Sequence, residues 1–579
     1  MASCATLSFE NTMKKTILLI TFIALFVYHS SAQATWQWAQ TSTSDYSDDV
    51  VTSVATDPSG NVYAVGYFFG TSVSFGAYTL TNVNSASLQQ LFVVKYDANG
   101  NVQWANTAGG YDQNQANAVT VDANGNVYIT GAFWGEYLSI GSIMLNTGVF
   151  AGANLSTMFI AKYDSNGILQ WAKFNNPPST GAGTVIGQSI ALDINNNAYI
   201  IGSFTINDLS IVGATLYNTT SGGGMSDVFV AKYNSNGTAM WALKAGGSGN
   251  DYGNGITTDT NGKIYITGTF HGGGAFSGIN LFTLGQQEMF VAKYDTLGTI
   301  NWAKEAYGYG YDYGQQIAAA TNNAIYVTGY YNSDSISFGT QTLHNASTTS
   351  TNDVFLVKYD STGTANWAIG AGGSSNDIGY AVSTNVIGDV YITGTFGGAS
   401  IFTGANSVAN NDSSTADIFI AKYNELGNLL WTSGIGGNRN DNANSLAVFG
   451  IDDLYIGGYY NSDSIQFGTH TVVNNNVGIN SSDAFVAKEG MLTSVGINDN
   501  RSKTKINIYP CPFSNTLNIQ LNDAEPAEIT VYDITSRKLL QQSVTGSTTL
   551  NTEQLANGIY IYELRNKNRM IKNGKLIKE

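Results

Sequence analysis

The sequence of 579 residues is long for one hydrophobic core, and it predicts several domains or an array of repeats. It holds 65 Gly and 34 Tyr but 6 Pro, and 11% of its residues are charged, which favours a repeat array over disorder. Between Thr35 and Glu489, 12 Lys and Arg accompany 32 Asp and Glu, a net charge of 12 − 32 = −20, so we expect no nucleic-acid partner, whereas cations and neutral sugars remain open.

The N-terminus has the pattern of an export signal. Lys14-Lys15 precedes an apolar run from Thr16 to Val27, and Ala32-Gln33-Ala34 supplies small residues for cleavage. The apolar run is too short to cross a bilayer. We therefore expect residues 1–34 to be a signal peptide, with Met13 as an alternative start, and no transmembrane segment in the mature chain.

One pattern recurs seven times in the main body of the chain. The tryptophans of the pattern are Trp38, Trp104, Trp171, Trp241, Trp302, Trp367 and Trp431. A Lys inside an apolar run follows each of them in phase, at Lys95, Lys162, Lys232, Lys293, Lys358, Lys422 and Lys488. Because the first copy opens on the Trp and the last ends on the Lys, the array starts and stops out of phase with its own unit.

The fourth copy shows the elements of the unit. Residues 251–259 and 263–270 flank a turn at Asn261-Gly262 and alternate apolar with small or polar residues, which predicts two strands. After a loop of variable length, residues 289–295 and 299–304 predict two more strands. We therefore expect four short antiparallel strands in each copy.

Four-stranded units of about 65 residues predict the blades of a β-propeller. A solenoid would need capping repeats, and the sequence has none. The first copy starts with an additional Trp-bearing strand at residues 35–40, and the last copy lacks that strand after Lys488. Pairing the two ends would remove two exposed sheet edges. The expected fold is all-β, with a seven-bladed β-propeller of four-stranded blades at residues 35–489 whose last blade is closed by the N-terminal strand.

Two strand sequences recur in most copies. One is GNVYITGAF at Gly125–Phe133, repeated as GDVYITGTF at Gly388–Phe396, and the other is FVAKYN at Phe229–Asn234, repeated as FVAKYD at Phe290–Asp295. With them, nearly all of residues 36–489 resembles the bacterial seven-bladed β-propeller repeat family of secreted proteins. The resemblance implies the fold and specifies no activity, since propellers support many unrelated functions.

The rhythm stops after Glu489. Residues 490–504 are predicted to be a linker, and residues 505–579 carry nine Lys and Arg against seven Asp and Glu. Short alternating segments in this part predict a small C-terminal β-sandwich. These segments are Leu517–Leu521, Glu528–Ile534 and Gly558–Leu564.

Three stretches of the C-terminal part carry a second resemblance. They are IYPCPF at Ile508–Phe513, ITVYD at Ile529–Asp533 and LANGIYIY at Leu555–Tyr562, followed by a basic tail. They resemble the C-terminal sorting domain of the type IX secretion system of Bacteroidetes-type bacteria, although Cys511 replaces a usual Asn and Ser536-Arg537-Lys538 a usual Gly-Lys pair. The resemblance implies that residues 505–579 engage the type IX machinery and that the protein is secreted or held at the cell surface; an ordinary adhesive sandwich is the alternative.

Motifs for nucleophilic or metal-dependent hydrolysis are absent from the sequence, including G-x-S-x-G, H-E-x-x-H, the P-loop and cysteine clusters. Three histidines follow the signal, His271, His344 and His470, all in variable loops where solvent exposure is the simplest expectation. A paired-carboxylate polysaccharide hydrolase or lyase remains an alternative, because 32 acidic residues offer many pairs.

Acids recur fourteen residues before the second-strand tyrosines. The seven positions are Asp49, Asn114, Val185, Asp251, Asp312, Asp377 and Asp441, each just ahead of the innermost strand. Five carboxylates near one channel mouth are candidate ligands for a hard cation such as Ca²⁺, the one cofactor that the sequence suggests. The alternative is that each Asp caps a turn or pairs locally. The Lys column favours this structural alternative, since a strand position repeated seven times indicates buried pairing with repeated acids.

Aromatic residues have two interpretations as well. The repeated Trp and Tyr positions are expected to fill the space between blades, whereas loop aromatics are candidates for stacking on sugars; the loop candidates include Phe69, Trp134, Tyr137, Tyr330 and Tyr459. Departures from the repeat are where a ligand site is expected. We therefore predict Trp134, Tyr137 and His271 as binding residues of a monomeric, non-catalytic module for a glycan, protein or matrix component.

Overall fold

The structure is a computed structural model that describes residues 35–490 and 506–578. Short gaps fall at 45–46, 84–86, 111, 149–154, 176–182, 212, 221–223, 348–349, 405, 476–480, 510–512, 522–525, 534–537 and 567–568. The signal peptide predicted at 1–34 lies outside the described residues, as does the predicted linker apart from Gly490. The chain divides into two compact units, residues 1–492 and 493–579, which are described separately.

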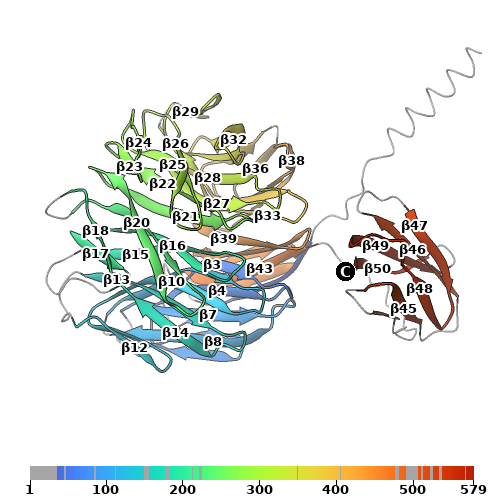
Figure 1. Ribbon diagram of the computed structural model, residues 1–579. Helices are drawn as coiled ribbons and strands as arrows, with labels where there is room; N and C mark the ends of the chain where they lie inside the picture. The colour runs from blue at the N-terminus through green and yellow to red at the C-terminus, as the bar shows by residue number, and fades with distance from the viewer. Residues whose placement is uncertain are drawn as a thin grey trace, which may run out of the picture. The chain divides into compact units, whose positions relative to one another are not determined.

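Regular secondary structure in the described residues consists of β-strands alone, and in the first unit these strands form seven four-stranded antiparallel groups (Figure 1). Groups 1 to 3 are β3 (Asp49–Thr56), β4 (Val62–Phe68), β7 (Gln90–Tyr96) and β8 (Val102–Gly110); β9 (Asn114–Val121), β10 (Val127–Trp134), β13 (Ser156–Tyr163) and β14 (Leu169–Phe174); and β15 (Val185–Leu192), β16 (Ala198–Phe204), β19 (Asp227–Tyr233) and β20 (Ala239–Gly247).

The next three groups repeat this order of strands. Groups 4 to 6 are β21 (Tyr252–Thr258), β22 (Ile264–Phe270), β25 (Glu288–Tyr294) and β26 (Ile300–Glu305); β27 (Asp312–Ala319), β28 (Ile325–Tyr331), β31 (Asp353–Tyr359) and β32 (Ala365–Gly373); and β33 (Asp377–Thr384), β34 (Val390–Phe396), β37 (Asp417–Tyr423) and β38 (Leu429–Ile435).

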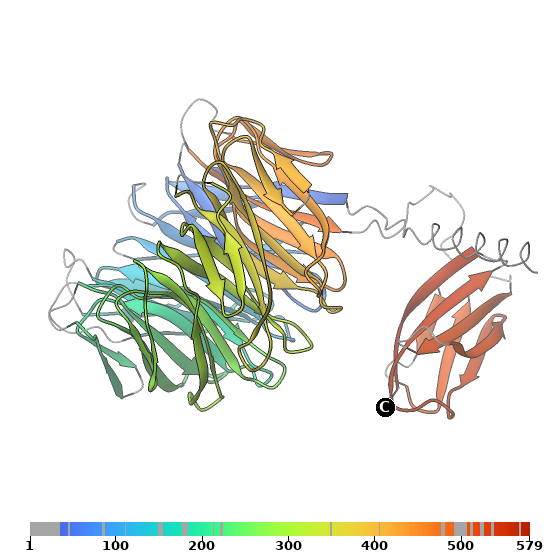
Figure 2. The ribbon, with the colours of Figure 1, turned by 90° about the horizontal axis from the view of Figure 1, so that it is seen from above.

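Group 7 is built from both ends of the unit. It contains β39 (Asp441–Phe449), β40 (Asp453–Tyr460), β43 (Asp483–Gly490) and, paired with β43, the N-terminal β1 (Thr35–Thr41). Figure 2 shows the blue N-terminal strand beside the orange strands of this group. The pairing of the two ends that the repeat phase predicted is therefore present. The innermost strands β3, β9, β15, β21, β27, β33 and β39 contact one another in this order, and β39 contacts β3, so the circuit closes.

The variable loop after the second strand of each group contains a short hairpin that the sequence did not predict. The seven hairpins are β5 (Ser72–Phe75) with β6 (Tyr78–Thr81), β11 (Tyr137–Ile140) with β12 (Ile143–Asn146), β17 (Asp208–Ile211) with β18 (Ala214–Tyr217), β23 (Gly274–Phe276) with β24 (Ile279–Leu281), β29 (Ser335–Phe338) with β30 (Gln341–His344), β35 (Ser400–Thr403) with β36 (Asn406–Ala409), and β41 (Ser464–Phe467) with β42 (His470–Val473). Three of them, at β11, β23 and β35, extend the sheet of the preceding group, and β5 pairs with the two-residue β2 (Thr43–Ser44). Neighbouring groups are thus joined at their outer edges as well as at the centre.

Hydrophobic side chains pack between consecutive groups rather than within one. One core cluster, for example, joins Tyr63 and Val93 of group 1 to Ile129 and Phe159 of group 2. Each sheet is buried on both faces, which explains the continuous apolar runs in the second and third strands. The first unit therefore owes its stability to contacts between groups, since one group alone exposes its apolar faces.

The Lys column has a different partner from the one predicted. Every Lys ammonium of the column lies 4.8–5.6 Å from the ring centroid of a second-strand tyrosine, as Lys232 does over Tyr199. Lys232 also donates to Thr296 O in the next group, and the neighbouring Trp241 Nε1 donates to the same oxygen. Among the described residues, two of the seven lysines, Lys422 and Lys488, form direct ion pairs. Direct ion pairing is therefore not repeated along the column. The repeated acids Asp122, Asp193 and Asp259 act on Lys162, Lys232 and Lys293 at longer range, and each ammonium also lies over an aromatic face.

The second unit contains two antiparallel sheets. One is β44 (Ile506–Tyr509), β45 (Thr516–Leu521) and β48 (Ser547–Asn551), and the other is β47 (Lys538–Val544), β46 (Ala527–Asp533), β49 (Gly558–Asn566) and β50 (Arg569–Lys578). Apolar side chains from both sheets form one core cluster, with Leu517 and Ile519 from the first and Ile529, Val531 and Leu564 from the second.

Candidate binding site at the axial cavity

The innermost strands of all seven groups enclose an axial cavity of about 670 Å³. Its lining consists of Val, Ile, Leu, Ala, Ser, Thr, Asn, Gln and Tyr side chains, and none of the described lining residues is charged. In a unit with a net charge of −20 over residues 35–489, this lining stands apart from the acidic surface. The cavity is suited to neutral, hydrogen-bonding groups rather than to ions.

A β-bulge in every innermost strand turns one extra residue towards this cavity. The seven bulge residues are Thr52, Asn117, Gln188, Asn254, Gln315, Tyr380 and Asn444, and all seven line the cavity. A bulge changes which face of a sheet a side chain occupies, so the alternation of the sequence alone does not reveal this ring.

Several bulge residues join one group to the next. Asn117 Nδ2 donates to Gly187 O at 2.9 Å, and Asn444 Nδ2 donates to Val51 O at 2.8 Å. Asn254 and Thr52 make equivalent bonds to the following group. Tyr380 is the departure from this pattern, because an aromatic ring occupies a position that otherwise holds a short amide or hydroxyl side chain.

Tyrosines form an arc at the end of the cavity where the innermost strands begin. Tyr67, Tyr380 and Tyr459 line the cavity, and Tyr330 stacks on Tyr313 with ring centroids 4.8 Å apart. Burial, and after it the neighbouring Tyr313 and Tyr380 hydroxyls, raises the pKa of Tyr330, so the pair in group 5 adjoins Tyr380 in group 6. We call Tyr67, Tyr313, Tyr330, Tyr380 and Tyr459 the tyrosine arc.

The arc occupies one sector of the mouth. Groups 2 and 3 place Gln115 opposite Ala132 and Ile186 opposite Ser203 at the positions that Tyr313 and Tyr330 hold in group 5. All five arc tyrosines are half-buried, so each retains some solvent-exposed surface. The asymmetry is a departure from the repeat, as expected of a ligand site.

An exposed aromatic loop continues the arc outward. Tyr307, Tyr309 and Tyr311, between β26 and β27, are 42%, 80% and 43% exposed, where groups 1, 3, 5 and 6 have a Gly-Gly pair. Gln286 N and Gln287 N donate to Gly310 O and attach this loop to the segment that carries the exposed Phe282 and Leu284. Tyr313 Oη donates to Gln287 Oε1, which links the loop to the arc.

A smaller pocket of about 300 Å³ adjoins the arc. Tyr459 forms one wall, with Ser414, Thr415, Arg439, Asn440 and Asn461 around it. Arg439 lies 3.5 Å from Asp463, so its charge is already paired. The pocket therefore adds hydrogen-bonding groups beside the arc rather than a free cation.

The predicted binding residues all lie at or just after the end of a second strand, but they belong to two different groups. Trp134 ends β10 and its backbone N donates to Gln113 O, Tyr137 starts β11 in the same group, and both are half-buried. His271 follows β22 two groups away, is exposed, and donates its backbone N to Asp251 Oδ1 at 2.9 Å. The structure does not bring Trp134 and His271 together in one site, and neither lines the axial cavity.

The five predicted cation ligands sit at the start of the innermost strands, yet none lines the cavity. Each is buried and accepts hydrogen bonds from its own surroundings: Asp312 from Ser333 Oγ, Asp441 from Ser462 Oγ and Asp251 from Gly247 N. Within the described ranges no three His, Cys, Asp or Glu side chains cluster in a way that could hold a metal ion. The geometry thus favours the local structural role over a shared cation for Asp49, Asp251, Asp312, Asp377 and Asp441.

An Asp side chain closes the turn between the third and fourth strands of group 1. Asp97 Oδ1 accepts from Asn99 N and Asn101 N at 2.9 Å, and Gly100 adopts φ +83°. A Cβ on Gly100 would lie 2.7 Å from Trp38 Cδ2, so only glycine lets this turn pack on the tryptophan of the preceding group. The Asp97 carboxylate is therefore engaged within its own turn.

Two family models match the chain. The secretion system C-terminal sorting domain matches residues 507–579. The protein is a secreted or cell-surface protein. The beta-propeller repeat matches residues 241–269, which cover β21 and most of β22. In the part of the chain that the structure describes, no helix is long and apolar enough to cross a membrane.

Two curated relatives are similar to this chain. An uncharacterized WD repeat-containing protein of Acanthamoeba polyphaga mimivirus is 28% identical over 469 residues, which is 69% of this chain and 33% of that protein. Regulatory protein FlaEY of Caulobacter vibrioides is 34% identical over 112 residues, 19% of this chain and 12% of that protein. The matched regions thus span a third or less of either relative.

Solved structures give only distant likenesses. Sqt1 from Chaetomium thermophilum has 10% identity and a TM-score of 0.33, with 77% of this chain and 87% of that chain covered. The extracellular domain of a hybrid two component system from B. thetaiotaomicron has 10% identity and a TM-score of 0.17, with 91% and 84% covered. At these TM-scores neither likeness supports an argument about function.

Proposed function

We propose that this protein is a non-catalytic binding module, a seven-bladed β-propeller at residues 35–489 that is exported through a C-terminal sandwich at residues 505–579 and takes a neutral glycan at the tyrosine arc. The arc is the observation that carries the proposal. It places five half-buried aromatic rings, from four groups, at one mouth of an uncharged cavity. Aromatic rings with polar edges stack on the apolar faces of sugars, and amide and hydroxyl groups bind sugar hydroxyls.

The alternative of a polysaccharide-degrading enzyme has less support. General acid and nucleophile carboxyls must reach the scissile bond. The described residues that line the axial cavity include no carboxylate, and the paired acids at the strand ends are buried away from it. The uncharged lining fits retention of a polysaccharide better than its cleavage.

Binding of the secreted full chain to a panel of soluble neutral polysaccharides by affinity electrophoresis tests the proposal. Tyr330→Ala and Tyr380→Ala are expected to weaken retention about tenfold each, because stacked rings contribute on the order of 0.5–1.5 kcal/mol beyond their buried area. Gln115→Ala is the matched control at the mouth of group 2 and should bind as the unmodified protein does. Equal binding by all three variants, no retention on any neutral glycan, or release of new reducing ends would overturn the proposal.

A further inference from the structure

Acidic residues meet in pairs at the junctions between consecutive groups. At each such junction, the first residue of a group's third strand faces the residue at the start of the next group's innermost strand. At the junction of groups 3 and 4 these residues are Asp227 and Asp251, and Asp251 N donates to Ser226 O, the carbonyl just before Asp227, at 2.7 Å. The pairs are Asp227 with Asp251, Glu288 with Asp312, Asp353 with Asp377, Asp417 with Asp441, and Asp483 with Asp49.

At the two remaining junctions, neither of the two positions holds an acidic residue. Gln90 and Asn114 occupy the junction of groups 1 and 2, where Asn114 Oδ1 accepts from Leu91 N at 3.0 Å. Ser156 and Val185 occupy the next one, where Ser156 Oγ accepts from Val185 N at 3.2 Å. Seven junctions therefore carry either two carboxyl groups or none. A position that merely capped a turn with an acid would have no reason to depend on its partner across the junction.

These carboxyl groups are shielded from water. The members of the five pairs are at most 2% exposed. Five of their oxygens accept no hydrogen bond from the described residues: Asp49 Oδ1, Glu288 Oε2, Asp353 Oδ1, Asp377 Oδ2 and Asp417 Oδ1. Two adjacent carboxylates in such a place would both be charged and partly unsatisfied, which is costly in a low-dielectric interior.

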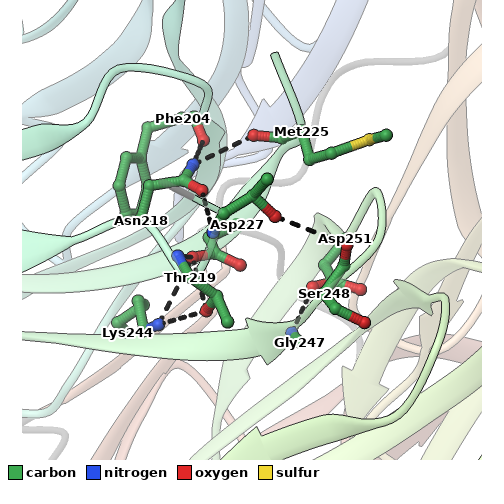
Figure 3. A network of polar contacts seen from close by, with 10 residues as sticks. Phe204, Asn218, Thr219, Met225, Asp227, Lys244, Gly247, Ser248 and Asp251 are labelled. Atoms are coloured by element: carbon green, nitrogen blue, oxygen red, sulfur yellow. Dashed lines mark hydrogen bonds and ion pairs between the residues drawn. The ribbon is translucent and has the colours of Figure 1, made fainter. Parts of the chain in front are cut away.

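The junction of groups 3 and 4 shows how the two groups meet (Figure 3). Asp227 Oδ2 accepts from Thr219 N at 2.6 Å and lies 3.3 Å from Lys244 Nζ. Asp251 N donates to Ser226 O at 2.7 Å, which holds the Asp251 carboxyl beside that of Asp227. A Cβ on Gly246 would lie 2.4 Å from Asp251 Oδ2 and 2.7 Å from Asp227 Oδ1, so both oxygens border the space that this glycine leaves. A hydrogen bond between two carboxyl groups requires a proton on one of them.

A metal ion fits these junctions less well than a proton. Asp251 already accepts N–H bonds on both oxygens, from Gly247 and His271, and Asp377 Oδ1 accepts from Gly397 N. Such donors point positive hydrogens at the oxygens that a cation would need. A hard cation takes six to eight oxygen ligands, and the described part of the chain offers no cluster of three or more acidic, His or Cys side chains.

We propose that each acidic junction is a proton-binding site, in which two buried carboxyl groups share one proton and so join consecutive groups of the ring. The proton turns a repulsive pair into a hydrogen-bonded pair. Loss of the proton restores two negative charges within one junction. Closure of the ring is thus linked to pH at five of its seven junctions.

The titration behaviour agrees with this geometry. Burial is the largest cause in each case and raises the pKa of Asp251, Asp312 and Asp441 to about 7 and that of Asp377 to about 8. The partner acid raises each pKa further, whereas the local N–H and O–H donors lower it. One member of each of these pairs therefore keeps its proton at a pH where an unfolded carboxyl group has lost it.

The junction of groups 5 and 6 is the best place for a test. Asp353 on β31 and Asp377 on β33 face each other there, Tyr331 at the end of β28 is the titratable group beside Asp353, and Gly372-Gly373 of β32 brings no charge. Asp377→Asn and Asp353→Asn reproduce the neutral chemistry of Gln90 and Asn114. Asp208→Asn, at an exposed carboxyl of β17, is the matched control.

Urea-induced unfolding of the full chain between pH 5 and pH 7.5 measures the protons released. Below the folded pKa the folded chain binds more protons than the unfolded chain, so the logarithm of the unfolding constant rises with pH, with a slope equal to the protons released. Asp377→Asn and Asp353→Asn should each lower this slope by about one, and Asp208→Asn should leave it unchanged. The infrared band of protonated carboxyl groups, recorded on folded protein at pH 6, should weaken in Asp377→Asn.

Two results would overturn the proposal. One is an unchanged slope in both junction variants, or, should they not fold, absence of the protonated-carboxyl band from the unmodified protein at pH 6. The other is a rise of the unfolding midpoint at pH 8 on addition of Ca²⁺ that disappears in Asp377→Asn, which would make the pair a cation site.

Discussion

Lys488 of β43 lies directly opposite Trp38 of β1, and this pair joins the two ends of the first unit. The same Lys-Trp register occurs within a continuous hairpin in the six other groups, for example Lys95 opposite Trp104. In group 7 the hairpin is absent, because the two strands come from opposite ends of the unit. Side-chain contacts must therefore hold β1 and β43 together, whereas in the other groups a turn connects the two corresponding strands.

Trp38 is the main such contact. It is 7% exposed, its ring centroid lies 6.1 Å from that of Tyr96 and 6.0 Å from that of Tyr455, and its Nε1 donates to Ala98 O at 3.1 Å. We expect Trp38→Ala to lower the free energy of unfolding by about 3–5 kcal/mol, the usual cost of removing a buried Trp. Chemical denaturation measures this loss.

The same change at Trp302, which is held in a continuous hairpin, is the control. Because β26 stays covalently joined to β25 and Trp302 is more exposed, Trp302→Ala should cost less than Trp38→Ala. An equal or greater loss in Trp302→Ala would contradict a special role for Trp38 in closing the ring.

Lys422 of group 6 reaches the turn between β39 and β40 of group 7 and has two acidic partners there and in its own group. Its Nζ lies 3.0 Å from Asp389 and 2.5 Å from Asp452, with all three side chains largely buried. Burial alone would lower the pKa of Lys422, but the hydrogen bonds with Asp452, Tyr391 and Asp389 outweigh it and raise the pKa. Lys422→Met should cost about 3–5 kcal/mol, because it leaves buried carboxylates without a counter-charge.

Lys232→Met is the comparison for that prediction. It removes a bond to a carbonyl and a contact with an aromatic face, while the nearby Asp193 keeps its hydrogen bonds from Asn195, Asn197 and Tyr199. Its expected cost is about 2 kcal/mol. Chemical denaturation of the two variants measures both losses. Equal losses in the two variants would contradict the ion-pair interpretation.

Gly372 keeps open the space that the Asp353 carboxyl occupies. A Cβ at this position would lie 2.3 Å from Asp353 Cγ, whereas the nearest atom to a Cβ on Gly370, in the same strand, is Tyr331 Oη at 3.6 Å. We expect Gly372→Ala to destabilise by about 1–3 kcal/mol through overpacking. Gly370→Ala should be neutral or slightly stabilising, because it removes backbone freedom from the unfolded chain. Thermal unfolding of the two variants decides between packing at the junction and a general effect of glycine.

The pH dependence of stability should have an unusual sign. Burial raises the pKa of Glu489 to about 7, against the lowering effect of Lys422, and the four junction aspartates titrate at about 7–8. Folded pKa values above the unfolded ones mean that the stabilisation is fully present below about pH 4 and is lost as pH rises through 7–8. Between its unfolded and folded pKa values, each of these carboxyl groups changes the free energy of unfolding by up to about 1.4 kcal/mol per pH unit. Urea midpoints that stay constant or rise from pH 5 to pH 8 would contradict this expectation.

The sequence predicted the strands and the pairing of the chain ends because those features repeat. Trp38 without a preceding strand and Lys488 without a following one suffice to pair β1 with β43. The junction pairs were missed, although they also left a signal. In four pairs the two acids are 24 residues apart, as in 251 − 227 and 377 − 353. Spacing alone does not show that the two positions face each other, because they belong to different sheets.

The tyrosine arc could be predicted only in part. Tyr330 and Tyr459 were among the loop aromatics considered, but both lie within strands, and Tyr380 was not recognised because a bulge moves it to the cavity. Trp134 and His271 were selected as breaks in the repeat, and the structure places them in separate groups. Whether they bind a ligand stays a prediction.

The pairing of β1 with β43 also sets an order of events for the growing chain. The first strand has to wait for a partner made more than 400 residues later, so the ring cannot close during most of synthesis, and such long-range pairing is slow. The sorting domain, at residues 507–579, comes after that partner strand. A chain cut short before β43 therefore lacks its export address as well, and every chain that carries the address also carries both halves of the closing sheet.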